Sequence, residues 1–396
     1  MYSQSFSPNN LYLYTTQSER RNSGLSKENL VQQVGLCIGD SIENGSFKFN
    51  IKVLHNLYLN NHPKGSMEFL CQDLVLRKLY HNIKRIYGID HANRDQIVKH
   101  LVLLLKEDAP KWIIRLDVQQ FYESINRSLI VERFLNDGRL NYQSICLLKK
   151  LFENPKLISA KGLPRGLSIS SVMSELYMKY FDLEIRRLDG VFYYARFVDD
   201  IIIFCVNKTI QEDVWTNVPV ILSSLGLTLN PDKSYKWNTQ QQKTKLTYLG
   251  YTFIPKGNKN VEIAIAEKKV NTIKTRITKS FVRFVNDGDF DQLKNRIKFL
   301  TGNFTRHHPS TLKPIKVGLY FNYNMATDKT ALYLLDKYYQ KLLHCCTGRL
   351  GMRLASKLSL EQRAQLEKYS FVFGYENHVN HFFTSAMLAE ITKCWR

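Results

Sequence analysis

Apolar residues recur three or four positions apart in two stretches near the start of the chain, 67–89 and 94–110. This spacing is typical of amphipathic helices, and Pro110 ends the second stretch. The next segment, "WIIRLD" (112–117), is a short apolar run of the kind that forms a buried strand. Helical spacing returns after it, so the pattern predicts strands alternating with helices.

The middle of the chain repeats this alternation. Residues 168–188 read as a long helix with Ser at its start, and "YYARFVDDIIIF" (193–204) reads as two strands joined tightly at a pair of aspartates. Helix, turn and strand follow over 218–237, and "KLTYLGYTFIP" (245–255) is a further strand with a Gly break. The pattern therefore predicts an α+β sheet domain over 67–255.

The flanking segments differ from this domain. Residues 1–66 are mixed and polar, and they end in the loop "NNHPKGS", so we interpret them as an N-terminal extension. After Pro255 the pattern predicts helices alone, which makes 256–396 a basic helical region. No apolar stretch reaches membrane-spanning length and no secretory signal is evident, so we expect a cytoplasmic protein without membrane contact.

Charge narrows the class of partner. The chain has 56 Lys and Arg against 35 Asp and Glu, a net charge of +21, and 22 Tyr and 22 Phe. From Lys256 onward 24 basic residues face 11 acidic ones, so this last third carries +13 of the excess. Such a balance favours a polyanion, with nucleic acid as the leading candidate; a solvated basic surface stays open as the alternative.

The seven cysteines are odd in number and scattered without a CxxC pair, so the sequence indicates neither a disulfide framework nor a zinc ribbon. The segments "HCC" (344–346) and "HVNH" (378–381) could meet around zinc. Ordinary helix packing is the other interpretation of these residues.

Two acidic positions carry the candidate chemistry. Asp117 ends a predicted strand, and Asp199 lies in a strand connection 82 residues later. If these strands are neighbours, the carboxylates converge and suit Mg²⁺, which binds one or two carboxylates together with substrate phosphates. Because adjacent strand residues point to opposite faces, we expect Asp199 to be the main ligand and Asp200 to be peripheral. Alone, an Asp pair in a turn would more often be a solvated connection.

The order of five motifs resembles the palm of reverse transcriptases, whose central motif usually reads Tyr-Ala-Asp-Asp. The motifs span about 140 residues and read "RLDVQQFYESI", "LPRGLSISS", "ARFVDD", "LGLTLNPDKS" and "LTYLGY". The resemblance implies a right-hand polymerase of the α+β class, with fingers, a palm built on an antiparallel sheet with helices, and an all-helical thumb after Pro255.

Matching positions carry implied roles. Asp117, Asp199 and Asp200 match the metal carboxylates for two Mg²⁺ ions, with Mn²⁺ as a substitute, and the Val118 carbonyl matches a further ligand. Tyr122 falls on the steric-gate position, where a bulky ring leaves no room for a 2′-hydroxyl and favours dNTPs. The remaining implied sites are Lys233 at the leaving pyrophosphate, Arg165 and Gly166 at template or nucleotide, Leu249, Gly250 and Tyr251 as a primer grip, and Arg94 or one of Lys84, Arg85 and Lys99 at the triphosphate.

Some positions depart from the usual pattern. Arg165 stands where Gln is usual, Ser170 and Ser171 replace Ser-Pro, Glu175 replaces Asn and Val198 replaces Ala. These variants resemble the bacterial reverse transcriptases of antiphage defence, including abortive-infection types, and most of all the first polymerase of the two-polymerase, type 3 system. The resemblance implies a noncoding RNA template, a DNA product and, as a protein partner, either a second reverse transcriptase or further copies of the chain.

Three functions stay open at this point. The first is an RNA-directed DNA polymerase that adds dNTPs by two-metal phosphoryl transfer in antiviral defence. The second is a template-independent or protein-primed DNA polymerase, started from a Tyr or Ser hydroxyl. The third is a polymerase-shaped RNA-binding scaffold without turnover.

Overall fold

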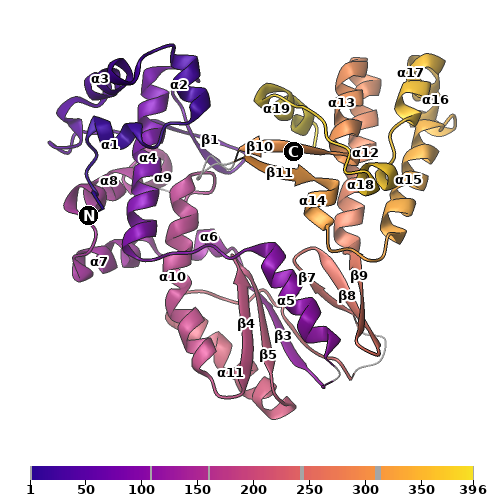
Figure 1. The fold of residues 1–396 in the computed structure, drawn as a ribbon, viewed down its shortest axis with the longest axis horizontal. Coiled ribbons are helices and arrows are strands. Elements are labelled where there is room, and N and C mark those ends of the chain that lie inside the picture. Colours follow the sequence, from indigo (N-terminus) through magenta and orange to yellow (C-terminus); the bar gives the residue numbers. More distant parts are fainter. Residues whose placement is uncertain (1, 108, 159–160, 241–244, 308–313, 396) are drawn as a thin grey trace. The chain divides into compact units, whose positions relative to one another are not determined.

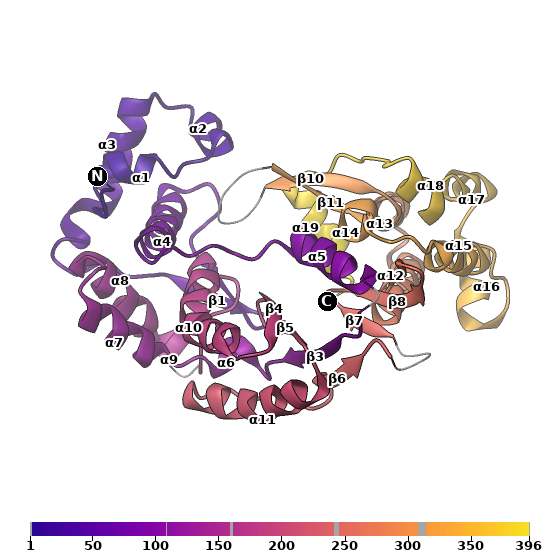
Figure 2. The same ribbon diagram turned by 60° about the horizontal axis from the view of Figure 1, so that its bottom comes forward.

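The structure is a computed structural model that describes residues 2–107, 109–158, 161–240, 245–307 and 314–395. Its contacts divide the chain into two compact units. The first unit contains 1–93 and 111–238, and the second contains 94–110 and 239–396. Figures 1 and 2 show the elements of each unit along the colour gradient of the chain.

The first unit begins with short helices that pack on a long one. These elements are α1 (Pro8–Tyr12), α2 (Gln17–Ser23), α3 (Lys27–Ile38), a 3₁₀ turn (Gly39–Ser41), β1 (Ile51–Leu54), β2 (Leu57–Asn60) and α4 (Met67–Ile86). Helix α4 starts where the Ser66 hydroxyl accepts a hydrogen bond from the Phe69 N–H, which is a standard N-cap.

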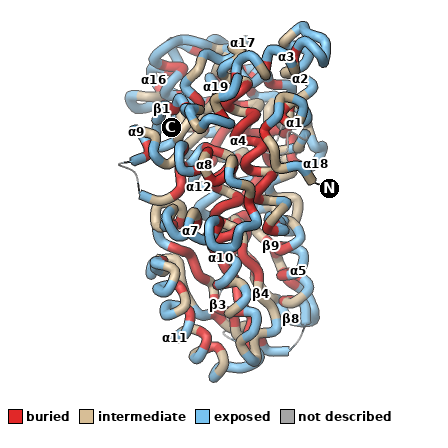
Figure 3. Tube along the Cα trace, turned by 90° about the vertical axis from the view of Figure 1, so that its left-hand side faces the viewer, coloured by how far each residue is buried: buried red, intermediate tan, exposed pale blue. Residues whose placement is uncertain are grey.

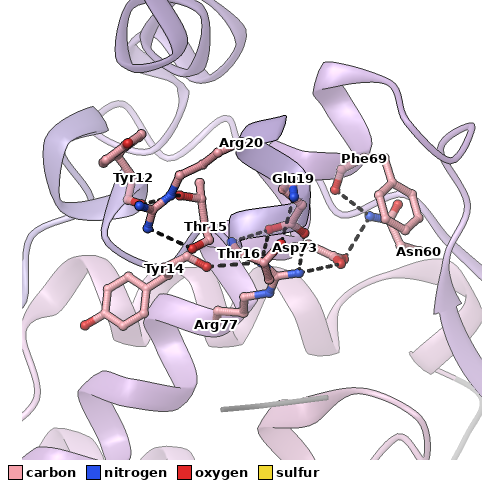
Figure 4. Close-up of polar contacts among 10 residues, drawn as sticks. All are labelled: Tyr12, Tyr14, Thr15, Thr16, Glu19, Arg20, Asn60, Phe69, Asp73 and Arg77. Carbon is pink, nitrogen blue, oxygen red and sulfur yellow. Dashed lines mark hydrogen bonds and ion pairs between the residues drawn. The ribbon is translucent and has the colours of Figure 1, made fainter. Parts of the chain in front are cut away.

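A buried ion-pair network fastens α2 and β2 to α4 (Figure 4). Arg77 Nη2 lies 2.7 Å from Glu19 Oε1 and 3.5 Å from Asp73 Oδ2. The Asn60 side chain donates to the other oxygen of Asp73 at 3.1 Å. Glu19 is also the capping-box residue of α2, so one carboxylate both caps that helix and docks it on α4.

The sheet of the first unit has the strand order β4-β5-β3-β6, and every neighbouring pair is antiparallel. Helices α10 and α11 pack against it, as the ribbon views show (Figures 1 and 2). The bounds are β3 (Trp112–Asp117), β4 (Val191–Phe197), β5 (Asp200–Cys205), β6 (Tyr235–Asn238), α10 (Ser168–Arg187) and α11 (Lys208–Ser224). Four further helices are α6 (Phe121–Ser124), α7 (Arg127–Asp137), α8 (Tyr142–Phe152) and α9 (Pro155–Ile158).

The core of the first unit explains why these elements form. Residues 201–205 of β5 are all buried, as expected of a central strand covered on both faces. Buried positions also follow α4 and the sheet strands in the burial view (Figure 3). The site described below therefore sits at the end of a rigid, fully packed strand.

The second unit combines a three-stranded sheet with helices and a hairpin. Its sheet order is β7-β8-β9, and β10 pairs with β11. The elements are α5 (Arg94–Lys106), β7 (Leu246–Tyr248), β8 (Tyr251–Gly257), β9 (Asn260–Ile265), α12 (Glu267–Asp287), α13 (Phe290–Thr301), β10 (Asn303–His307), β11 (Pro314–Gly318), α14 (Leu319–Tyr323), α15 (Thr330–Leu343), α16 (Gly348–Lys357), α17 (Leu360–Glu367), α18 (Phe371–Glu376) and α19 (Ser385–Lys393).

The predicted fold class is confirmed: helices combine with antiparallel sheets, as in a right-hand polymerase. One detail is wrong, because the region after Pro255 is not all-helical. Strand β9 continues the sheet, and β10 and β11 form a hairpin. The apolar residues of β9 alternate at 261, 263 and 265, which is the strand period rather than the helix period.

The contact division also differs from the three predicted segments. The predicted N-terminal extension is part of the first unit, and 94–110 joins the C-terminal half of the chain. The functional names of the segments stay predictions. Within the described ranges, none of the helices combines the length and the apolar character that crossing a membrane requires.

Candidate active site

The predicted metal carboxylates meet at one end of the four-stranded sheet. Asp117 is the last residue of β3, and its register partner on the antiparallel strand β5 is Asp200. Residues directly opposite each other on antiparallel strands share a sheet face, so these two carboxylates start from the same side. Asp117 is 4% exposed, which is rare for a carboxylate without specific partners.

Asp199 reaches the same place from a tight turn. Phe197 pairs with Asp200, so Val198 and Asp199 form a two-residue connection between β4 and β5. Val198 has φ +60°, a region that β-branched residues avoid at a cost of about 1–3 kcal/mol. Asp199 therefore sits outside both strands, and simple strand alternation does not decide which aspartate faces a metal ion.

The Asp199 carboxylate is in an unfavourable environment for a negative charge. Burial raises its pKa above the ordinary value, and the charges of Asp200 and Asp117 raise it further. Its own backbone N–H and the Lys233 ammonium lower the pKa, but they do not cancel the rise. Among the described residues the Asp199 carboxylate takes part in no ion pair, so an added cation would relieve the repulsion.

Asp200 and Asp117 each have a cationic neighbour. Arg115 Nη2 lies 3.2 Å from Asp200 Oδ1. Lys233 Nζ lies 2.9 and 3.1 Å from the two oxygens of Asp117, and the Asn230 amide donates to the same carboxylate at 3.1 Å. The predicted lysine thus contacts the Asp117 carboxylate directly, and its side chain is 43% exposed.

The Val118 backbone lies between the Asp199 connection and residues 228–230. Hydrogen bonds from Asn230 to Asp117 and from Gln119 to Thr228 flank the bridge between Val118 and Leu229. The Val118 N–H points the other way and donates to the Asp199 carbonyl at 3.3 Å. The role of the Val118 carbonyl as a further metal ligand stays a prediction.

These oxygens suit a hard divalent cation. Across the described ranges, no group of three or more His, Cys, Asp or Glu side chains is gathered tightly enough to form a metal cage. Mg²⁺ does not need one, because it binds through one or two carboxylates and completes its shell with water and substrate phosphates. Asp117, Asp199, Asp200 and the Val118 carbonyl therefore fit a cation that is shared with a substrate.

One prediction follows from the raised pKa of Asp199. A carboxyl whose pKa is higher in the folded than in the unfolded state destabilises the fold once it is ionised. In metal-free buffer at pH 7, Asp199→Asn should raise the melting temperature by about 2 °C. The gain should shrink as the pH falls toward the ordinary Asp pKa, where both states become protonated. Calorimetry with chelator at pH 7 and pH 4.5 measures this difference.

The control for that experiment is Asp213→Asn, which removes an exposed carboxylate of α11. It should leave the melting temperature unchanged at both pH values. A fall in melting temperature for Asp199→Asn at pH 7 would contradict the repulsion inferred for the site.

Tyr122 lies close to the aspartates. It belongs to the short helix α6, and the Asp199 and Glu175 charges contribute to raising its pKa, although burial is the larger cause. The Arg165 guanidinium lies 5.6 Å from the ring centroid, and Phe121 packs edge-on against the ring. Tyr122 is thus a half-buried ring within electrostatic reach of Asp199, and its role as a steric gate stays a prediction.

The "LPRGLS" loop contacts α6 and β2. Arg165 pairs with Glu123, with Nε to Oε1 at 2.6 Å, so its guanidinium is held beside Tyr122. Gly166 has φ +100°, and a Cβ there would lie 2.8 Å from the Tyr58 carbonyl of β2. The glycine is therefore required by this internal contact. Its predicted approach to template or nucleotide stays a prediction.

Gly162 sets the position of Tyr122. It has φ +70°, and a Cβ there would lie 2.1 Å from the Tyr122 carbonyl, which already accepts the Leu163 N–H at 2.7 Å. We expect Gly162→Ala to cost about 3 kcal/mol of unfolding free energy, because backbone would have to move. Denaturant unfolding measures this loss of free energy. The control Gly138→Ala has a similar φ of +58° with nothing within 4 Å, and should cost only about 1 kcal/mol; equal losses would contradict the clash.

The predicted primer-grip residues and Arg94 lie in the second unit. Leu249 and Gly250 form a two-residue hairpin turn between β7 and β8, both with positive φ, which explains the Gly in this motif. Arg94 donates to the Leu249 carbonyl at 2.6 and 3.1 Å and to the Asn322 carbonyl at 2.9 Å. Its guanidinium also lies 4.9 Å from the Tyr251 ring centroid.

These contacts change the interpretation of Arg94. Its donors hold the turn within the second unit, and its role at the triphosphate stays a prediction. The hairpin predicted at 249–251 is present, and its function as a primer grip stays a prediction. Zinc binding by the two His and Cys segments lacks support, because the described residues hold no metal cluster; His344 pairs with Glu367, and His378 lies against the Tyr320 ring.

Two basic residues of the site were not predicted from the sequence. Arg115 pairs with Asp200, and Arg196 binds two carboxylates of α10 behind the Asp199 turn. One signal was available: Glu175, noted as an unusual residue, is an acid at a position that becomes buried and therefore needs a cation. Its partner lies 21 residues away on another element, which no local pattern reveals.

Comparisons with known proteins bear on this geometry. Residues 64–253 match the family model described as reverse transcriptase (RNA-dependent DNA polymerase). This part of the chain therefore resembles a reverse transcriptase domain. It contains all three aspartates, Tyr122 and the Val198 turn, and its match supports the predicted enzyme class, an RNA-directed DNA polymerase.

Individual relatives are distant. Protein P of hepatitis B virus genotype C (isolate Japan/S-207/1988) is 23% identical over 134 residues, and that of genotype A2 (isolate Japan/Nishioka/1983) is equally similar. These matches cover 34% of this chain and 15% of the viral proteins. The aligned part thus spans a small fraction of the length of these curated relatives.

Among solved structures, apo telomerase from Candida tropicalis aligns with a TM-score of 0.42 and 15% identity, over 81% of this chain and 57% of the telomerase chain. Telomerase from Candida albicans, in complex with a TWJ fragment of telomeric RNA, aligns with a TM-score of 0.38 and 13% identity, over 87% and 61% of the two chains.

Proposed function

We propose that this protein is an RNA-directed DNA polymerase that adds dNTPs to a growing strand. The observation that carries the proposal is the convergence of Asp117, Asp199 and Asp200 at one sheet end within the reverse transcriptase domain. Two carboxylates on facing strands and a third in the adjoining turn form an oxygen-rich corner in a chain of net charge +21. Such a corner attracts metal-bound phosphates, and the basic surface attracts the polymer.

The three aspartates and the Val118 carbonyl would hold two Mg²⁺ ions, or Mn²⁺ in their place. Bound there, such ions stabilise the attacking and leaving oxygens of phosphoryl transfer. Tyr122 would lie against the sugar and exclude a 2′-hydroxyl. Lys233, now paired with Asp117, would be free to donate to the leaving pyrophosphate once that carboxylate is otherwise engaged.

The template we propose is an associated noncoding RNA, and the biological role is antiviral defence in the cytoplasm. Support for this part comes from the sequence: Arg165, Glu175 and Val198 are variants that resemble bacterial defence reverse transcriptases. A second reverse transcriptase or another copy of the chain is the protein partner that this resemblance favours.

The test uses the protein purified with its bound nucleic acid. Incubation with Mg²⁺ and labelled dNTPs should give DNA whose sequence is complementary to the bound RNA, and RNase treatment beforehand should abolish it. Synthesis that resists RNase and has no fixed sequence would instead indicate a template-independent polymerase. Product that stays attached to protein after denaturation would indicate protein priming, and no product with any primer would indicate a scaffold.

A further inference from the structure

Arg196 is a buried arginine that lies directly behind the Asp199 turn. It is on β4, and its side chain is 4% exposed. It donates to both oxygens of Asp182 at 2.8 Å each, and to both oxygens of Glu175 at 2.7 and 3.3 Å. Tyr194 donates to the same Asp182 carboxylate at 2.6 Å.

The guanidinium also holds the turn itself. Arg196 Nη1 donates to the Val198 carbonyl at 3.1 Å, and the peptide bond that contains this carbonyl joins Val198 to Asp199. All five N–H donors of the arginine are thereby used, four on carboxylates and one on the turn. A lysine has three donors on a single point charge and cannot reproduce this pattern.

Helix α10 supplies both carboxylates. Glu175 and Asp182 are seven residues apart, two helical turns, so they lie on one face of the helix. Because α10 is anchored in the core through Ile169, Met173 and Phe181, the arginine ties the turn to a rigid element. The same Glu175 charge acts on Tyr122, so this helix borders both the aspartate turn and the tyrosine ring.

We propose that Arg196 is a positioning residue for Asp199. Its bond to the Val198 carbonyl holds the strained left-handed backbone at Val198, and the Glu175 and Asp182 carboxylates fix the guanidinium in turn. The Asp199 carboxylate is thereby kept in one place against the repulsion of Asp117 and Asp200. This inference rests on the proposed function in that Asp199 is taken as a metal ligand.

The test compares Arg196→Lys with Arg187→Lys, a matched change at an exposed arginine of α10 whose side chain is 74% exposed. Mn²⁺ affinity is measured by electron paramagnetic resonance, and kcat and KM for dNTP are measured on the same preparations. Arg196→Lys should weaken Mn²⁺ binding about 10-fold and lower kcat about 10- to 100-fold, as loss of an outer-shell partner does, with KM within about twofold. Arg187→Lys should match the unmodified protein.

A second pair of variants, with a smaller change in charge and shape, is used if Arg196→Lys does not fold. Glu175→Gln keeps the shape of the side chain and weakens its ion pair with Arg196. The control Glu184→Gln makes the same change at another residue of α10, which pairs with Arg187. Glu175→Gln should lower Mn²⁺ affinity by about threefold or more. The inference is overturned if a folded Arg196→Lys protein binds Mn²⁺ as tightly as Arg187→Lys does. If Arg196→Lys does not fold, the inference is overturned when Glu175→Gln binds Mn²⁺ as tightly as Glu184→Gln does. An unmodified protein that binds Mn²⁺ but makes no DNA would contradict the proposed function alone.

Discussion

Replacing Asp199 with Ala should lower the rate of DNA synthesis by about 10,000-fold, which corresponds to roughly 5.5 kcal/mol of transition-state stabilisation. The turn places this carboxylate within electrostatic reach of Asp200 and Asp117, and burial and both charges raise its pKa. Such a carboxylate is poised to bind a cation, because ion binding removes the repulsion that folding leaves in place. Primer extension with saturating Mg²⁺ and dNTPs measures the loss.

Two further variants make this result specific. Asp213→Ala removes an exposed carboxylate of α11 and should keep full activity. Asp200→Ala should lose less than Asp199→Ala, about 100-fold, because Arg115 already neutralises part of the Asp200 charge. Circular dichroism and melting curves establish that each variant is folded. An Asp199→Ala protein that is folded and extends primers at the normal rate would refute the proposed mechanism.

The structure gives a different physical reason for expecting Asp199→Ala to lose more activity than Asp200→Ala. Strand alternation alone would turn the two side chains to opposite faces. In the structure Asp199 is in the connection and Asp200 pairs in register with Asp117, so alternation does not separate them. Asp200 differs from Asp199 because it forms an ion pair with Arg115. These two residues lie on different strands and are 85 positions apart in the chain.

Several features of the site could be predicted because they are local. The apolar runs before Asp117 and after Asp200 have strand character, and the order of motifs links them to one family. The left-handed turn at Gly250 is likewise readable from a few neighbouring residues. Local chemistry therefore located the aspartates, the hairpins and the loop that carries Gly166.

The missed features depend on partners that are far apart in the chain. Arg94 looked like a free cation on a helix, but its donors go to carbonyls 155 and 228 residues away. Arg196 looked like an ordinary strand residue, but α10 supplies its two acids. The strands after Pro255 were missed for another reason: they are five or six residues long, and an apolar alternation of that length competes poorly with the longer helical patterns around it.

Replacing Tyr122 with Ala should reduce the preference for dNTP over rNTP by about 100-fold. The ring is held by Phe121 and the Arg165 guanidinium next to the Asp199 turn, and the carbonyl of Tyr122 is fixed by the 161–167 loop. A rigid ring cannot move aside for a 2′-hydroxyl, whereas the space left by Ala admits one. A steric change of a few heavy atoms in a tight pocket supports discrimination of this size.

The ratio of kcat/KM for dNTP and rNTP, measured on one primer and template, tests this expectation. Tyr122→Phe is the matched control, because it keeps the ring and removes only the hydroxyl, which interacts with Ser174. The Phe variant should retain the preference for dNTP, and the Ala variant should gain activity with rNTP while its dNTP activity falls by less than about tenfold. Unchanged discrimination in the Ala variant would mean that the sugar does not contact this ring, and that another residue selects deoxynucleotides.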